Sequence, residues 1–452
     1  MSNMMGFVKK RWPLIVSIVV ILAALPAGWI VSNGLNSGIK QRQESAANSL
    51  LSSLDGLRVT YELPGLVEGM EPVQNSGMPH EKLTEFYREA QQAQAERLAE
   101  ATEAIIAFNH KERGVLVEGL FPKQPEDDSE AQLLRLRMQD MLIPGSGDSA
   151  YEQLLERVGA TTPPDAQRVL DTLNDTRARL FERESAQSGA SEPDDEELDA
   201  ITQELVAQRV SLYARPAQEN SIYLTLDQFP IGSPFDVSPS FPRQAVSGSP
   251  SHGRTFLWQF DYWLAEDLIG FFVEANSRDG RLLPIVDAPI KRVLTIDGQP
   301  LQLGGGGGDS EWEDTIDPGP DASNQVFEPR FFQSPSGREL GWNNQLYDLR
   351  RVELSLIVDS ARIPEIIDAA SRHNLMTVVD LDVSSIDVWS DLELGFYYGQ
   401  DHVVRLDIEL EILYLRAWTA PVMPDTVRLE LGLEPHPEPA AEDGFGDEQG
   451  PG

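Results

Sequence analysis

Hydrophobic residues are most concentrated near the N-terminus, where no charged residue occurs between Trp12 and Ile39. The apolar centre of this run extends from Leu14 to Val31. At about 1.5 Å per residue it can cross most of a hydrocarbon layer that is roughly 30 Å thick. The pattern predicts a transmembrane helix over residues 12–35, with Trp12 at one interface.

Three basic residues come directly before this helix: Lys9, Lys10 and Arg11. By the positive-inside rule they place residues 1–11 in the cytoplasm and the bulk of the chain in the periplasm of a bacterial inner-membrane protein. Two alternatives remain open. Leu25-Pro26-Ala27 is compatible with a cleaved signal peptide. Cleavage after Gly6 would be compatible with a pilin-type leader, although Lys9 and Lys10 interrupt the apolar stretch that should follow.

Helical spacing then continues through residues 36–215, which we interpret as a helical, coiled-coil-like stalk. The longest segment, 81–113, contains neither Pro nor Gly and carries apolar residues at intervals of three and four. The candidate oligomer contacts on this stripe are Leu83, Tyr87, Ile105 and Phe108. A solvated helix that packs on its own domain is the alternative. Further helices are predicted at residues 36–57, 130–142, 149–158, 164–184 and 198–213.

A period of two replaces the helical period after a Pro-rich linker at residues 216–254. Residues 255–420 predict strands at 256–262, 290–296, 352–358, 379–383 and 404–412, with helices after the first and third of them. Residues 298–345 include five consecutive glycines and predict a flexible insertion. The fold class is therefore α+β, with a C-terminal ferredoxin-like βαββαβ domain. Residues 421–452 predict an acidic, disordered tail.

Charge separates the two ends of the chain. The sequence has 36 basic and 73 acidic residues, a net charge of −37. Residues 1–45 carry five basic residues and one acid, so the remainder carries −41. Such acidity argues against nucleic acid as a partner. The chain has no cysteine, which excludes disulfides, thiolate metal sites and cysteine nucleophiles.

No motif indicates catalysis, a cofactor or a metal. The six histidines have no metal-ligand spacing, and the Ser247–Gly253 segment lacks a nucleophile elbow. The Gly304–Asp309 run satisfies a calcium β-roll repeat only once, whereas such repeats bind calcium when stacked. Asp380 and Asp382 form one row of carboxylates, and Asp407, Glu409 and Glu411 form another. We interpret both rows as a solvated or partner-binding sheet face. The aromatic row Phe256, Trp258, Phe260 and Tyr262 is interpreted as core.

Together, these features resemble the PilO and GspM family of bitopic inner-membrane proteins. The similarity rests on the basic N-terminus, the single membrane helix, the helical stalk and the Val352–Ile412 succession of strands and helix. It implies a component of a type IV pilus or type II secretion assembly platform. Such a component would be a non-enzymatic scaffold in contact with inner-membrane lipid, and it would form homo- or hetero-oligomers with other bitopic platform proteins. The chain is about twice the usual length of this family.

Two other function classes remain as alternatives. One is a membrane-anchored sensory ectodomain that binds a ligand through the aromatic row. The other is an anchored hydrolase with a carboxylate pair, which would require two carboxyl groups within roughly 5–10 Å in a cleft.

Overall fold

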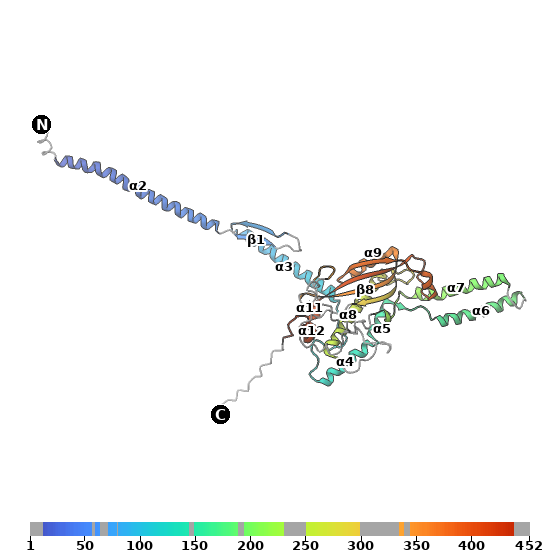
Figure 1. The fold of residues 1–452 in the computed structure, drawn as a ribbon. Coiled ribbons are helices and arrows are strands. Elements are labelled where there is room, and N and C mark those ends of the chain that lie inside the picture. The colour runs from blue at the N-terminus through green and yellow to red at the C-terminus, as the bar shows by residue number, and fades with distance from the viewer. Residues whose placement is uncertain are drawn as a thin grey trace, which may run out of the picture. The chain divides into compact units, whose positions relative to one another are not determined.

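The computed structural model (Figure 1) describes residues 12–56, 59–63, 71–78, 80–143, 149–188, 194–229, 250–298, 334–338 and 344–437. The chain divides into two units, Met1–Glu103 and Ala104–Gly452. Helix α3 begins in the first unit and ends in the second. The α+β class and the long apolar N-terminal helix are confirmed.

The first unit consists mainly of helix. Helix α2 (Trp12–Asp55) has 44 residues, so it is about 66 Å long at 1.5 Å per residue. It therefore merges the predicted membrane helix with the predicted helix at 36–57. A small antiparallel hairpin follows, formed by β1 (Val59–Leu63) and β2 (Val73–Gly77). Helix α3 (Glu81–His110) comes next.

The helices of the second unit have clear end signals. Ser149 and Glu152 form a capping box at the start of α5, and Gly159 ends that helix in the left-handed conformation, at φ +63°. Asp194 and Glu197 form the same box at the start of α7. The longer helices are α4 (Asp128–Leu142), α5 (Ala150–Val158), α6 (Ala166–Ser188), α7 (Asp195–Glu219), α8 (His252–Ala275) and α9 (Ile363–His373).

Short elements complete the second unit. The helices are α10 (Val388–Glu393), α11 (Arg416–Thr419) and α12 (Asp425–Glu430). The 3₁₀ turns are η1 (Leu226–Gln228), η6 (Ser360–Arg362) and η7 (Ala420–Val422). A two-residue hairpin is formed by β5 (Ser277–Arg278) and β6 (Arg281–Leu282).

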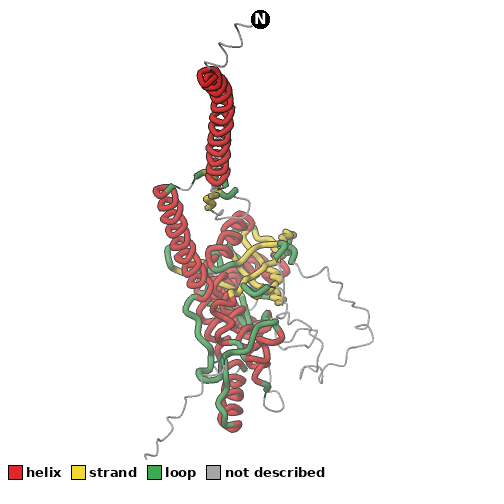
Figure 2. Tube along the Cα trace, turned by 90° about the vertical axis from the view of Figure 1, so that its left-hand side faces the viewer, coloured by secondary structure: helices red, strands yellow, loops and turns green. Residues whose placement is uncertain are grey.

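A six-stranded mixed sheet with the order β3-β4-β7-β8-β10-β9 forms the centre of the second unit (Figure 2). Its strands are β3 (Ala160–Thr161), β4 (Ile222–Tyr223), β7 (Ile290–Gly298), β8 (Tyr347–Asp359), β9 (Met376–Ser384) and β10 (Val403–Leu415). The first three run parallel, and each later neighbour is antiparallel.

The core lies between one face of this sheet and the helices packed on it. The buried side chains of β8 and β10, such as Leu354 and Leu406, join α8 and α9 in one hydrophobic cluster. The helices α4 and α5 add Met138, Leu142 and Tyr151 to the same cluster. The predicted stalk at 36–215 is therefore not one element, because its apolar α4 and α5 faces are buried in the sheet domain.

The predicted strand at 256–262 is wrong, because these residues lie inside α8, which is capped by Ser251. A helix that is apolar on all sides is buried on all sides, and Phe256, Trp258 and Phe260 are fully buried. The intervening polar residues are also buried, with partners. Gln259 accepts a hydrogen bond from the Leu116 N–H. The apparent alternation therefore does not mark a solvent-facing side.

Three predicted boundaries also change. The linker predicted at 216–254 contains the end of α7, β4, η1 and the start of α8, although residues 230–249 lie outside the described part. The tail predicted from 421 begins inside the folded unit, because Met423, Val427 and Leu431 are buried in the core. Residues 334–338 of the predicted insertion contact the sheet, whereas residues 299–333 lie outside the described part.

Candidate interaction surfaces

Helix α2 carries the candidate membrane anchor. Among the described residues it is the one helix long and apolar enough to cross a membrane, over Val19–Ser53. Trp12 is 63% exposed and Val31 is 61% exposed. The basic residues Lys9, Lys10 and Arg11 and the side chain of Leu14 lie outside the described part.

Helix α3 has one apolar face and one acidic face. Of the predicted contacts, Ile105 is 48% and Phe108 39% exposed, whereas Leu83 and Tyr87 are half-buried. Two further apolar residues, Phe86 and Leu98, lie at the two margins of this stripe and are 60% and 58% exposed. The opposite face carries the exposed acids Glu85, Glu89, Glu96 and Glu103. An amphipathic helix with an exposed apolar stripe is a candidate surface for another helix.

The hairpin β1–β2 covers the first turns of α3, which explains why Leu83 and Tyr87 are less exposed. The rings of Tyr61 and Tyr87 stack with centroids 5.1 Å apart. The hydroxyl of Tyr61 lies 2.7 Å from the hydroxyl oxygen of Thr84 and accepts a hydrogen bond from the His80 N–H. The stripe beyond Tyr87 is not covered by this hairpin.

The C-terminal end of α3 is attached to the sheet through Asn109, which is fully buried. Its side-chain oxygen accepts hydrogen bonds from the Leu415 N–H and from the indole of Trp418. Its amide nitrogen donates to the Leu413 carbonyl and to Asn374. The Asn109 side chain thus pairs with the edge of β10 just beyond the end of β9, as the backbone of a strand residue would. Every hydrogen-bonding position of this side chain is satisfied.

A buried ion pair lies beside Asn109. The guanidinium of Arg113 contacts Asp267 of α8 at 2.7 Å, and both side chains are almost completely buried. Asn374 donates to the other oxygen of Asp267 at 2.8 Å. Burial alone would raise the pKa of Asp267, but a hydrogen bond from His373 and the charge of Arg113 lower it. We define Asn109, Arg113, Asp267, Asn374 and Trp418 as the α3 joint.

The α3 joint was not predicted from the sequence, because the partners of Asn109 lie 265 to 309 positions away along the chain. Lys111 and Glu112, which lie between Asn109 and Arg113 of this joint, have left-handed backbone conformations at φ 51° and 56°. Conformations of this kind cost energy for residues other than glycine and persist where surrounding contacts enforce them. The joint is therefore a strongly determined connection between α3 and the sheet.

The predicted carboxylate rows on the outer sheet face are largely occupied by local partners. Asp407 accepts from Ser355 at 2.5 Å, and Glu409 pairs with Arg351. The fully buried Glu411 pairs with Arg338 at 3.1 Å. Asp407, Glu409 and Glu411 therefore belong to a network of hydrogen bonds and ion pairs within the domain.

His252 and the aromatic row have structural contacts. Among the described residues, no group of three or more His, Asp or Glu side chains is arranged to hold a metal ion. His252 is the first residue of α8 and lies 2.7 Å from the Leu120 carbonyl oxygen. The aromatic row that the sensory alternative needs is core, since Phe256, Trp258 and Phe260 are fully buried.

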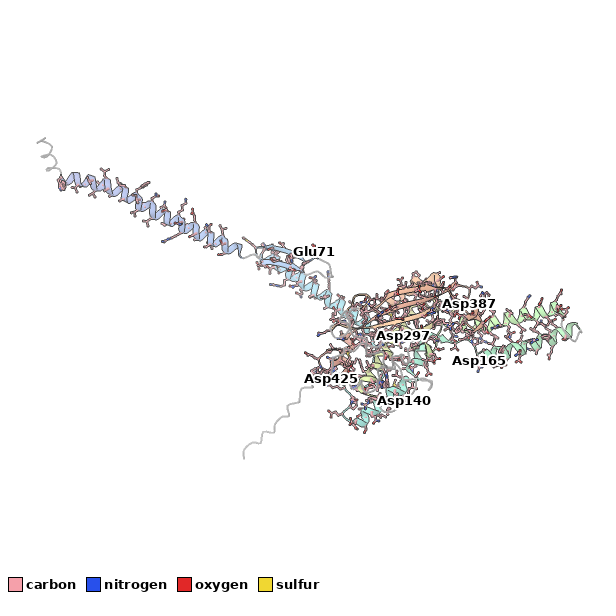
Figure 3. The ribbon with its side chains drawn as sticks, viewed as in Figure 1. Glu71, Asp140, Asp165, Asp297, Asp387 and Asp425 are labelled. Carbon is pink, nitrogen blue, oxygen red and sulfur yellow. The ribbon has the colours of Figure 1, made fainter. Side chains whose placement is uncertain are left out.

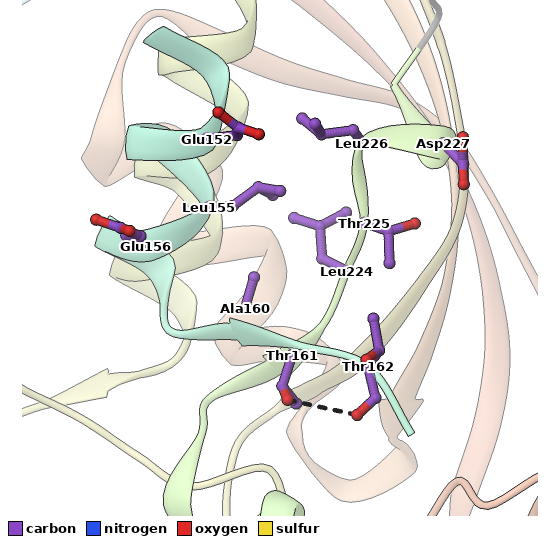
Figure 4. Close-up of a pocket in the computed structure, with 10 residues that line it drawn as sticks. All are labelled: Glu152, Leu155, Glu156, Ala160, Thr161, Thr162, Leu224, Thr225, Leu226 and Asp227. Carbon is purple, nitrogen blue, oxygen red and sulfur yellow. Dashed lines mark hydrogen bonds between the residues drawn. The ribbon is translucent and has the colours of Figure 1, made fainter. Parts of the chain in front are cut away.

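One open cavity of about 780 Å³ lies between α5, β3 and the segment before η1 (Figure 4). Leu155, Leu224 and Leu226 point toward one another across it, while the carboxylates of Glu156 and Asp227 point away. Polar residues line the same cavity, among them Glu152, which extends toward Leu226, and Thr225. The cavity does not by itself indicate a binding activity.

The chain was compared with family models, curated proteins and solved structures, and none of them matches it. Function must therefore be inferred from the surfaces described above.

Proposed function

We propose that this chain is a single-pass, membrane-anchored scaffold without enzymatic activity, and that it works through contacts between its α3 helix and other copies or other bitopic proteins. In this proposal the N-terminus lies in the cytoplasm and the sheet domain in the periplasm. The setting would be an assembly platform of the type that PilO and GspM form in type IV pili and type II secretion systems.

The observation that carries the proposal is the apolar face of α3. Phe86 and Leu98 expose more than half of their surface on the helix that follows the candidate anchor. A helix that leaves such residues in water gains stability when a second helix covers them, at about 25 cal/mol for each Å² of apolar surface removed from water. Anchoring in a common membrane would also raise the local concentration of neighbouring α3 helices.

The strand order gives separate support. Strands β8 and β9 are joined through α9 and both lie antiparallel to β10, which is between them, while β7 lies on the outer side of β8. A ferredoxin-like sheet contains the same split β-α-β arrangement. The usual order of elements in a ferredoxin-like domain is βαββαβ. We interpret the succession α8-β7-β8-α9-β9-β10 as a circular permutation of that order, in which the chain begins at the second helix of the fold.

Cysteine cross-linking in membranes tests the proposal directly, because the natural chain contains no cysteine. Phe86→Cys and Leu98→Cys should each give a disulfide-linked dimer on mild oxidation. Glu85→Cys and Glu96→Cys, on the acidic face of the same helix, are the matched controls and should remain monomeric. The geometry of a disulfide requires Cβ atoms about 3.5–4.5 Å apart, so face selectivity reports close packing.

A partner of different sequence is captured by placing a photoreactive phenylalanine analogue at positions 86 and 98. The proposal fails if neither disulfides nor photoproducts form on the apolar face. It also fails if both faces of α3 cross-link equally, because random collision would then explain the products.

A further inference from the structure

Helix α10 presents exposed apolar side chains on the periphery of the sheet domain. Trp389 is 77% exposed, Leu394 is 66% exposed and Val388 is 40% exposed. The three residues lie within seven consecutive positions, and we refer to them as the α10 surface. An exposed tryptophan of this kind is uncommon on a domain whose other aromatic residues are largely buried, and Trp is enriched at the centres of protein interfaces.

The segment that carries these residues is fixed by contacts with side chains of the sheet domain. Asp391 accepts hydrogen bonds from Arg292 at 3.0 Å and from the Tyr398 hydroxyl at 2.8 Å. The guanidinium of Arg292 also stacks over the ring of Phe396, 3.5 Å from its centroid. The exposure of Trp389 therefore does not result from a loose loop.

Two glycines after α10 have backbone conformations and close contacts that determine the path of the following chain. Gly395 has φ +95°, and a Cβ there would lie 3.1 Å from Pro163. Gly399 has φ +87°, and a Cβ there would lie 3.0 Å from the Val286 carbonyl oxygen. A surface that is ordered before binding loses little conformational entropy when a partner binds.

Acidic groups surround the α10 surface. Residues 374–404 contain six acids and no Lys or Arg. Asp387 caps α10 through the N–H groups of Trp389 and Ser390, and Glu393 ends the helix; both are exposed. Two basic side chains reach α10: Arg292 is paired with Asp391, and Arg209 of α7 donates to the Glu393 backbone carbonyl, so the carboxylates of Asp387 and Glu393 are the acidic groups left to face a partner. Hydrogen bonds from Ser390 and Trp389 lower the pKa of Asp387, so this carboxylate stays ionised at neutral pH.

From this combination we propose that the α10 surface is a docking site for a basic segment of a partner protein, whose Lys or Arg side chains lie over the Trp389 ring and between the carboxylates of Asp387 and Glu393. The exposed face of a Trp ring attracts a guanidinium or ammonium group, and its edge packs against aliphatic stems. A second copy of this chain is disfavoured, because its own carboxylates would face those of the first. The proposal goes beyond the α3 pairing and does not depend on it.

The test uses the full-length protein in host membranes, with a photoreactive phenylalanine analogue in place of Trp389. The expected product is an adduct with a different protein, and peptide mapping should locate the cross-link within about one helical turn of at least two Lys or Arg residues. The matched control carries the same analogue in place of Leu429, which is 61% exposed on α12 and should give no comparable product.

A charge-neutral variant, Asp387→Asn with Glu393→Gln, separates charge from exposure. With the analogue still at 389, the adduct yield should fall about three- to tenfold, as expected for the loss of two exposed charge contacts. An adduct to a second copy of this chain, to lipid alone or to a segment without Lys or Arg would overturn the proposal. Equal yields from positions 389 and 429 would do the same. The α3 cross-links are measured on separate variants, so either proposal can fail alone.

Discussion

At the scale of single residues, Asn109 has the clearest structural role. It makes four hydrogen bonds from a fully buried position, and three of its partners belong to β10 or the helix that follows it. Replacing it with Ala would leave the Leu415 N–H and the Leu413 carbonyl without their partner. An unsatisfied buried polar group costs about 1–3 kcal/mol, so Asn109→Ala should destabilise the second unit by at least about 2 kcal/mol.

Urea unfolding of the full-length protein, followed by tryptophan fluorescence, measures this effect because Trp418 contacts Asn109 directly. Asn109→Asp should also destabilise, since a carboxylate cannot donate to Leu413 or Asn374. Asn174→Asp, at an exposed position of α6, makes the same chemical change and should leave the midpoint unaltered. Equal midpoints for Asn109→Asp and the natural protein would exclude the proposed role of the amide.

Lys111 gives the α3 joint a dependence on pH. Burial lowers the pKa of Lys111 from 10.5 to about 8, although the neighbouring Asp267 raises it in part. The unfolded chain therefore holds this proton more tightly than the folded chain does. The resulting destabilisation is fully present below about pH 8 and disappears as the pH rises through 10.5.

We expect the natural protein to gain stability between pH 8 and 10.5 relative to Lys111→Gln. The measurement is the difference between their urea midpoints at several pH values, so that titrations common to both proteins cancel. The size of the gain is reduced by solvent screening because Lys111 is only half-buried. A constant difference across this range would contradict the prediction.

At the scale of elements, β9 shows how the sheet protects its edge. Alternate residues of β10 direct their N–H and C=O groups toward β9, and the hydrogen bond from the Leu413 N–H to the Leu375 carbonyl identifies which residues these are. By the pairing of the two strands, the N–H groups of Leu381 and Val383 then point away from β10, to the open side of β9. The carboxylates of Asp380 and Asp382 accept these two N–H groups at 2.9 Å. These two N–H groups are therefore not free to pair with an added strand.

Removing both carboxylates should open this edge. We expect Asp380→Ala with Asp382→Ala to cause concentration-dependent self-association, measured by light scattering of the purified full-length protein. Asp380→Asn with Asp382→Asn keeps the side-chain oxygens but removes the charges, and it should remain as dispersed as the natural protein. If the Asn variant associates as strongly as the Ala variant, charge repulsion and not hydrogen-bond capping protects the edge.

The elements also show what local pattern can predict. Strands β8 and β10 and helix α9 lie close to their expected positions, because each has one buried and one polar side whose period is visible in the sequence. The first half of helix α8 was predicted as a strand because it is buried on all sides, whereas the helix predicted directly after that strand corresponds to its second half. Gly270 in its middle accommodates the ring of His373, since a Cβ there would lie 2.0 Å from that ring. The α3 joint depends on long-range partners, which periodicity does not report.

At the scale of the whole molecule, the acidic side chains are distributed over many elements, as the labelled residues in Figure 3 illustrate. A net charge of −41 beyond residue 45 is thus a general property of the surface. Charge of one sign keeps a protein soluble and opposes non-specific association. The exposed apolar side chains of α3 and α10 interrupt this charged surface, and they are the two places where we propose specific contacts.

The same charge distribution predicts the orientation of the chain in the membrane. Basic residues stay on the cytoplasmic side, so Ser2→Cys should react with a membrane-impermeant maleimide only after the cells are lysed. Trp389→Cys, at an exposed position of the sheet domain, should react in cells with a permeabilised outer membrane and an intact inner membrane. Labelling of Ser2→Cys in intact cells would reverse the predicted orientation. Loss of the Ser2 label from the mature chain, with Trp389 still labelled, would show that the N-terminal segment is cleaved and that α2 is not a permanent anchor.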